Sequence, residues 1–422
     1  MKKRTAIAVI FFLFLSVLDS ETLFAANRQS DSGISGDIFG RHQRALHLFL
    51  DITEKYTDNF YNADIFKESE KITTISPGLV LALPGADITD IDMSASTAAP
   101  GGFSMTRYKM ETDRQYQGIL VYNPEFELYD EHRDENFTSQ KLKGAFQYNT
   151  GGLTLDIADS YRHAQEMRGD AGNPNPDTYD ANVIHAIAEF AFSPMLSVGI
   201  GEAYNSLSYR ETDFRDRSDT FFSGWVNLNL SSKTKLFCEY QYIDVEYDSN
   251  ASALARDNQE DLIYGGISWK MTAKTRGTCK LGYMSKDFKN SAVEDLDDLT
   301  GEIRITHELT PRTLLMLNAS RKYYETNLAA ASCYTADRIS AAYFQAFTPK
   351  LMGSLSLSYG SDDYNGIDVD ADTYMARPAL TFEPTRWLSF ELAYSYTKRR
   401  AEKMPVMDYR TNEYTFKISG KF

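Results

Sequence analysis

The sequence predicts an all-β protein, a transmembrane antiparallel up-and-down β-barrel of about 18 strands with short periplasmic turns and long external loops. Three observations predict this fold. Apolar and polar residues alternate with a period of two over most of the chain, tight-turn signals recur through it, and the amino terminus has the pattern of a secretory leader. Tight turns on one edge of a sheet and long polar loops on the other are typical of outer-membrane barrels.

The composition narrows the classes of protein further. The chain has 422 residues, with 44 Lys and Arg against 59 Asp and Glu and a formal net charge of −15, so it is a poor candidate for nucleic-acid binding. Its three cysteines, Cys238, Cys279 and Cys333, are too few for a disulfide framework. After the leader no stretch is long and apolar enough for an α-helical membrane span.

The first element is the leader at residues 1–26. It begins with Lys2, Lys3 and Arg4, continues through the apolar run AIAVIFFLFLSVL and ends in small residues, which predicts a cleaved signal peptide. The alternative, an uncleaved anchor, would require a longer apolar run. We expect residues 27–45 to form a periplasmic tail and residues 46–422 to form the barrel.

The strands follow in order. Three are predicted before the first tight turn, at 46–56, 72–83 and 117–128. Seven turn signals, near residues 150, 194, 232, 274, 310, 349 and 384, then join fourteen strands, and a last strand occupies 412–422. In one of these strands Leu355, Leu357 and Tyr359 alternate with Ser356 and Ser358. The long external connections are expected at 129–136, 167–181, 246–261 and 361–372.

Aromatic residues gather toward the strand ends, as in the interfacial girdles of membrane barrels. One group lies near the short turns: Tyr148, Phe192, Phe347, Phe382 and Trp387. The other lies toward the long loops: Tyr161, Tyr204, Tyr242, Tyr283, Tyr359 and Tyr396. A soluble β-sandwich or propeller also alternates, but its buried face would be dominated by bulky aliphatic residues. We therefore expect outer-membrane lipid as a partner.

The chain ends on an apolar stripe formed by Tyr414, Phe416, Ile418, Gly420 and Phe422. A terminal aromatic residue on such a stripe resembles the signal that the barrel assembly machinery reads. We expect this machinery to be a second partner.

The segment 50–85 resembles the opening of the putative β-barrel porin type 2 family of Gram-negative outer membranes. The matching residues are Tyr56 to Asn59, Ile75 to Leu79 and Leu83 to Gly85. This resemblance implies a cell outer membrane location and an association with exopolysaccharide synthesis and export. Residues 86–116 depart from the family pattern, and could form a long periplasmic turn, a constriction in the lumen or extra strand length.

The polar face of each strand would line an aqueous path in a barrel this wide. The predicted pore-lining residues are Lys141, Lys143, Lys235, Glu239, Lys270, Arg276, Lys280, Arg304, Arg377 and Lys417, together with Lys421 and the acids Glu189, Glu302, Glu383 and Glu391. Basic residues outnumber acidic ones in this set, and a basic ring favours anions. The hypothesis is a porin-like channel for anionic solutes or an acidic exopolysaccharide. Alternatively, the bases only pair with acids across strands, and an error of one residue would invert each assignment.

Other functions find less support in the sequence. No histidine lies in a nucleophile motif, and Asp130, Glu131 and His132 are the nearest candidates for a barrel protease. Loop acids at 368–372 lack the glycine and glutamate of a calcium loop. We therefore expect no enzymatic activity, no metal site and no cofactor. A structural or adhesive barrel without transport shares every feature with a channel and stays open as an alternative.

Overall fold

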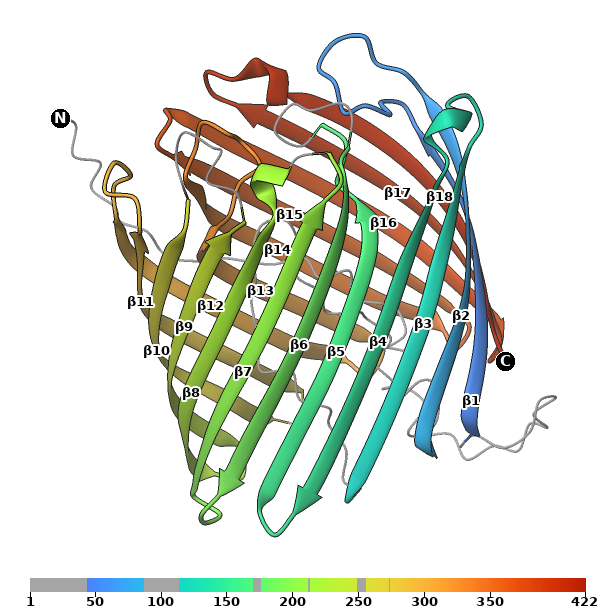
Figure 1. Cartoon of the computed structure of the whole chain (residues 1–422). Coiled ribbons are helices and arrows are strands. Elements are labelled where there is room, and N and C mark those ends of the chain that lie inside the picture. Colours follow the sequence, from blue (N-terminus) through green and yellow to red (C-terminus); the bar gives the residue numbers. More distant parts are fainter. Residues whose placement is uncertain (1–43, 87–113, 170–175, 212, 249–255, 273) are drawn as a thin grey trace.

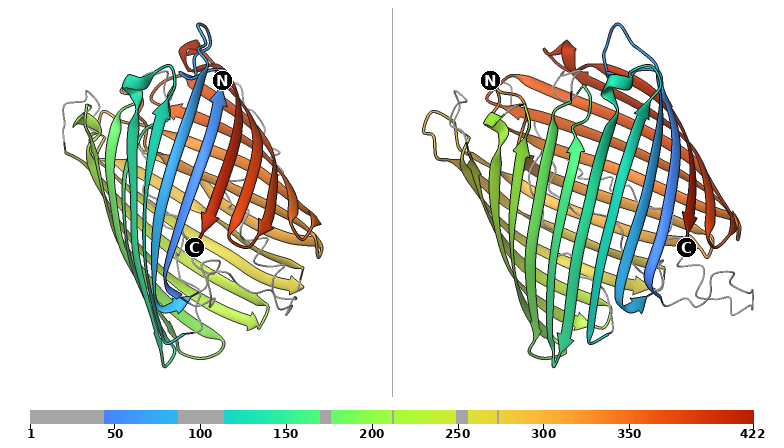
Figure 2. Two further views of the ribbon diagram at one scale, coloured as in Figure 1. Left: turned by 90° about the vertical axis from the view of Figure 1, so that its right-hand side faces the viewer. Right: turned by 45° about the vertical axis from the view of Figure 1, so that its right-hand side comes forward.

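The structure is a closed antiparallel β-barrel (Figures 1 and 2). The computed structural model describes residues 44–86, 114–169, 176–211, 213–248, 256–272 and 274–422. Eighteen strands form one sheet, in which each strand pairs with its neighbours along the chain and β1 (Arg44–Thr57) pairs with β18 (Tyr409–Lys421) to close the barrel. The predicted fold class and strand count are confirmed. The predicted leader, most of the tail and most of the 86–116 insertion lie outside the described residues.

Two strands lie between β1 and the first hairpin that has a tight turn. They are β2 (Glu70–Ala86) and β3 (Tyr116–Tyr129), predicted at 72–83 and 117–128. The segment between them therefore leaves and re-enters the sheet on the edge that carries the tight turns.

Seven hairpins with tight turns follow, and each predicted turn signal falls at one of them. The strands are β4 (Phe137–Thr150), β5 (Leu153–Gln165), β6 (Thr178–Ala191), β7 (Leu196–Tyr209), β8 (Arg217–Ser231), β9 (Thr234–Tyr247), β10 (Asn258–Thr272), β11 (Thr275–Phe288), β12 (Leu296–Thr310), β13 (Thr313–Tyr324), β14 (Cys333–Thr348), β15 (Leu351–Asn365), β16 (Val369–Thr385) and β17 (Leu388–Ala401). In the β4–β5 turn Gly151 and Gly152 have φ of 51° and 86°, which only glycine adopts without cost. Short 3₁₀ turns lie at Arg133–Glu135, Asp213–Arg215 and Pro405–Met407, and no helix in the described ranges could cross a membrane.

One predicted long loop, at 361–372, is wrong. The ladder continues through this stretch, where Asp363 pairs with Asp370 and Tyr364 with Val369, and only residues 366–368 form the turn. The acidic composition predicted a solvated loop, but a hairpin that extends past the barrel rim is equally polar and still forms its ladder.

The two faces of the wall differ as the alternation predicts. On β1, Leu46, Leu48 and Leu50 are exposed on the outside, whereas His47 and Phe49 are buried on the inside. By register, all the predicted girdle residues within strands point outward, and Phe192 and Trp387 lie in turns. The outer face is therefore apolar with aromatic ends, as lipid contact requires.

The inner face is less uniformly polar than the sequence suggested. Along β8–β11 it carries buried apolar side chains, among them Phe221, Trp225, Ile243, Leu262 and Met284. Along β15 the inner face instead carries half-buried Ser354, Ser356 and Ser358. The lumen thus has an apolar side over β8–β11 and a polar side over β15–β18.

Candidate pore lining

The cross-strand register places the predicted pore-lining residues on the inner face. Lys143 is opposite Ser160, Lys280 is opposite Glu302, and Arg377 is opposite Ser356. The remaining members follow the same alternation: Lys141, Lys235, Glu239, Lys270, Arg276, Arg304, Lys417 and Lys421. The pattern of alternation in the sequence was therefore sufficient to separate the two faces at these positions.

Many of these bases are ion-paired with acids on the inner face. The pairs are Lys141–Glu125 at 2.9 Å, Lys280–Glu302 at 3.4 Å, Lys280–Glu239 at 4.0 Å, Arg304–Glu302 at 3.0 Å, Lys417–Asp51 at 2.8 Å, and Arg377 with Glu391. Asp51 and Glu125 were not among the predicted lining residues. The wall is therefore less basic than predicted, because the inner face carries acids beyond the predicted set.

A local basic excess remains along β9–β12 at the end of the lumen that carries the tight turns. Lys270 and Arg276 are exposed there, and the Arg304 side chain is 58% exposed although it contacts Glu302. We call Lys270, Arg276 and Arg304 the turn-end bases. On the turn-end half of the inner face of β9–β12, the bases Lys235, Lys270, Arg276, Lys280 and Arg304 outnumber the acids Glu239, Glu302 and Glu308. A solute that passes this side of the lumen meets a local excess of positive charge.

The opposite, long-loop end of the lumen contains a buried charged network centred on Glu325. Glu325 follows β13 and accepts hydrogen bonds from Tyr247 Oη at 2.5 Å, Asn258 Nδ2 at 3.2 Å and Lys286 Nζ at 2.5 Å. Lys286, which is fully buried, also donates to Glu260 at 2.5 Å. These partners come from β9, β10 and β11, so the β13–β14 loop folds inward over three neighbouring strands.

Further contacts extend this Glu325 cluster. Arg256 Nη1 donates to the carbonyl oxygen of Thr326 at 2.6 Å, and Arg217 lies 3.1 Å from Asp219. Burial alone would raise the pKa of Glu325, but the charges of Lys286 and Arg217 outweigh it and hold the pKa at about 2. Glu325 is therefore ionised and neutralised in place. Nothing in the polar sequence around Glu325 indicated that it would be the buried centre of a charged cluster.

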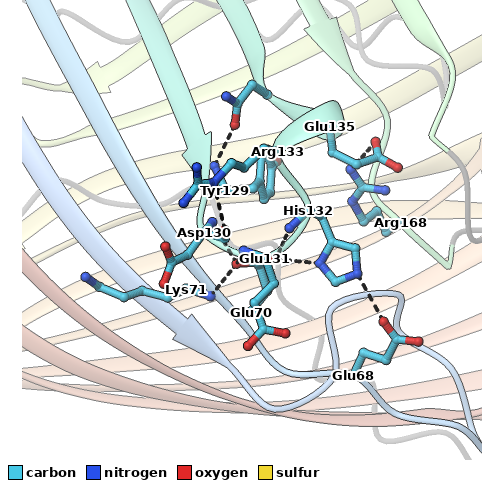
Figure 3. A network of polar contacts seen from close by, with 11 residues as sticks. Glu68, Glu70, Lys71, Tyr129, Asp130, Glu131, His132, Arg133, Glu135 and Arg168 are labelled. Atoms are coloured by element: carbon cyan, nitrogen blue, oxygen red, sulfur yellow. Dashed lines mark hydrogen bonds and ion pairs between the residues drawn. The ribbon is translucent and has the colours of Figure 1, made fainter.

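A second polar network, the rim clamp, joins three loops at the long-loop edge (Figure 3). Glu70 accepts hydrogen bonds from the backbone N–H groups of Asp130 (3.0 Å), Glu131 (3.1 Å) and His132 (3.0 Å), and also from the His132 ring at Nδ1. His132 Nε2 lies 3.0 Å from Glu68. The hydrogen bond to Glu70 raises the pKa of His132. The predicted protease candidates are thus held by a carboxylate from β2.

Arg168 links the rim clamp to the next loop. Its guanidinium lies 3.0 Å from Glu135 and 4.2 Å from the Phe60 ring, and its carbonyl accepts from Asn62 Nδ2 at 2.8 Å. The β1–β2, β3–β4 and β5–β6 loops are therefore tied to one another on one side of the mouth.

The predicted assembly stripe lies on the outer face of β18. Tyr414, Phe416 and Phe422 are exposed there, in one row with Ile418 and Gly420. Phe422 forms two backbone hydrogen bonds with Leu48, at 2.7 and 3.1 Å, where the barrel closes. The stripe therefore faces lipid next to the β1–β18 seam.

Comparison with known proteins agrees with this architecture. The model of the family described as Putative beta-barrel porin 2 matches residues 196–422, more than half of the chain. The chain belongs to this family. The matched range begins after the segment 50–85 that carried the resemblance in the sequence. Membership and the closed barrel together place this porin-family chain in the cell outer membrane, with its tight turns in the periplasm and its long loops outside.

Solved structures with similar folds include three proteins of Pseudomonas aeruginosa. OccK2 (OpdF) is 11% identical, with a TM-score of 0.48, covering 91% of this chain and 99% of that one. The outer membrane protein opdK is 11% identical, with a TM-score of 0.46 and coverage of 89% and 98%. The siderophore receptor PirA is 8% identical, with a TM-score of 0.45 and coverage of 91% and 81%. No curated protein sequence matches the chain.

Proposed function

We propose that this outer-membrane barrel is a channel that passes anionic solutes. The observation that carries the proposal is the local basic excess along β9–β12 at the periplasmic end of the lumen, where the turn-end bases are exposed. Positive charge on a pore wall raises the local concentration of anions and lowers the barrier to their passage. The half-buried serines on the inner face of β15 give the lumen a polar wall, along which a hydrated anion could pass.

An acidic exopolysaccharide is one cargo that this wall would suit. The proposal rests on the exopolysaccharide association that family resemblance implies, together with the basic turn-end wall. A polymer leaving the cell would enter from the periplasm and meet these bases first. We propose no enzymatic activity, because both ring nitrogens of His132 contact carboxylates, Glu68 and Glu70, and neither faces a nucleophile.

The second candidate is a structural or adhesive barrel without transport. The inward-folded β13–β14 loop favours it, because Glu325, Thr326 and Ala331 are buried at the long-loop end. Together with the apolar side over β8–β11, this loop narrows the lumen from one side.

Single-channel recording in planar bilayers separates the two candidates. We expect the purified barrel to produce discrete open steps, and the reversal potential in a KCl gradient to indicate chloride preference. Open steps with cation preference would contradict the anion proposal. A correctly folded barrel without conductance would favour the structural candidate instead.

A further inference from the structure

The outer surface of the barrel carries a basic cluster just above its aromatic belt. Lys398 on β17 and Arg410 on β18 are directly opposite each other in the ladder, and both point outward. Arg400, two residues beyond Lys398, shares this face, and Lys67 Nζ donates to the Arg410 carbonyl at 2.8 Å. We call these four residues the outer basic patch. Arg400 and Arg410 are exposed and Lys398 is partly buried.

The position of the patch is that of lipid headgroups. Tyr396 lies two residues below Lys398 on the same outward face, a rise of about 7 Å along the strand. Tyr374 is opposite Lys398 on β16, and the Tyr394 and Tyr414 rings lie 5.1 Å apart below the patch. Tyrosines on the outer wall mark the membrane–water interface. The basic side chains therefore lie at the outer edge of the membrane on its lipid side.

Two other outward lysines at this rim have acidic partners. Lys71 lies 3.1 Å from Glu54, and Lys289 contacts Asp244 at 3.4 Å and Glu246 at 3.0 Å. Within the described ranges, Lys398, Arg400 and Arg410 form no ion pair. The acid nearest to the patch in the ladder is Asp372, opposite Arg400, and it accepts a hydrogen bond from Tyr359 at 2.8 Å.

Like charges directly opposite each other in a ladder destabilise it unless a counterion lies between them. Lysine and arginine are the usual ligands of phosphate groups, and arginine adds paired donors. We propose that the outer basic patch binds the phosphate of a phosphorylated glycolipid of the outer leaflet, with its acyl chains against the aromatic belt. This site is independent of any channel activity, since it lies on the other face of the wall.

Heat stability of the purified, folded barrel in non-ionic detergent tests the site. The readout is the temperature at which half of the protein loses its compact electrophoretic mobility. The probes are bis-phosphorylated lipid A, the same lipid without phosphates, and inorganic phosphate. We expect only the phosphorylated lipid to raise the midpoint. An equal rise with the dephosphorylated lipid, or with inorganic phosphate alone, would overturn the assignment.

Variants localise the effect. K398Q/R410Q should lose most of the lipid-dependent rise, and its midpoint without lipid should stay equal or increase because a like-charged pair is removed. K71Q/K289Q removes the same charge from paired positions and should keep the rise. If K398Q/R410Q responds to the lipid as the wild type does, the proposal is wrong. R410Q alone serves as the test if the double variant fails to fold.

Discussion

The charged side chains are buried and paired at one end of the lumen and exposed at the other. At the long-loop end, the three buried bases Lys286, Arg217 and Arg256 balance three buried acids, which are Glu260, Glu325 and Asp219. At the tight-turn end, Lys270 and Arg276 are exposed and lie in a local excess of positive charge along β9–β12. The difference follows from the connections, since a long loop can fold inward and bury the charges below it, whereas a two-residue turn cannot.

This contrast separates charge that holds the barrel together from charge that a solute can meet. A buried, neutralised network exerts little electrostatic field on a passing ion, but removing one of its members greatly lowers the stability of the protein. Exposed bases contribute little to stability, yet they set the potential at the mouth. Variants at the two ends should therefore change different properties.

The largest effect is expected at the long-loop end. Lys286→Met leaves Glu260 and Glu325 buried without their cation, and we expect a loss of about 3–5 kcal/mol in the free energy of unfolding. Urea titration of the barrel in lipid vesicles measures it. As a control, Lys71→Met breaks an exposed pair with Glu54 at the same rim and should cost less than about 1 kcal/mol. Equal losses in the two variants would show that burial does not distinguish these ion pairs.

A smaller, purely electrical effect is expected at the tight-turn end. The variant K270Q/R276Q/R304Q should keep wild-type stability, while its anion-to-cation permeability ratio falls several-fold because the local excess of positive charge is removed. Reversal potentials in a KCl gradient measure this ratio.

The matched control removes three paired bases from the outer surface, in K71Q/K289Q/K403Q. Its net charge changes by the same amount, but the wall of the lumen is intact, so selectivity should stay close to that of the wild type. A triple turn-end variant with unchanged selectivity would place the selective region elsewhere.

Much of this comparison could be predicted from the sequence. Alternation with a period of two predicted the face of residues such as Lys280 and Arg377. Short turn signals, five of the seven with glycine or proline, located every tight turn. These features are local, so a single strand or turn contains all the information they need. The same local reasoning failed at 361–372, where an acidic stretch is strand and not loop.

The partners of the charged groups could not be predicted. Tyr247 and Glu325 are 78 residues apart, and Lys417 pairs with Asp51 only because the barrel closes. The apolar inner patch was also hidden, because Phe221 and Phe222 are adjacent and interrupt the alternation that would separate inside from outside. Long-range pairing decides which predicted bases stay exposed, and the sequence pattern does not contain it.

The smallest expected effect concerns the rim clamp, and it depends on pH. The hydrogen bond to Glu70 raises the pKa of His132 above its ordinary value of 6.5, so protonated His132 stabilises the clamp. This contribution is fully present below pH 6.5 and is lost as the pH rises through the raised pKa. Amide exchange at 130–136, corrected for its intrinsic pH dependence, should therefore be slowest in mildly acidic solution and faster above the transition. His132→Gln should exchange faster at low pH and lose this transition, while exchange in β15 stays unchanged. A pH profile that is the same in both proteins would mean that the backbone hydrogen bonds to Glu70 hold the loop without the imidazole.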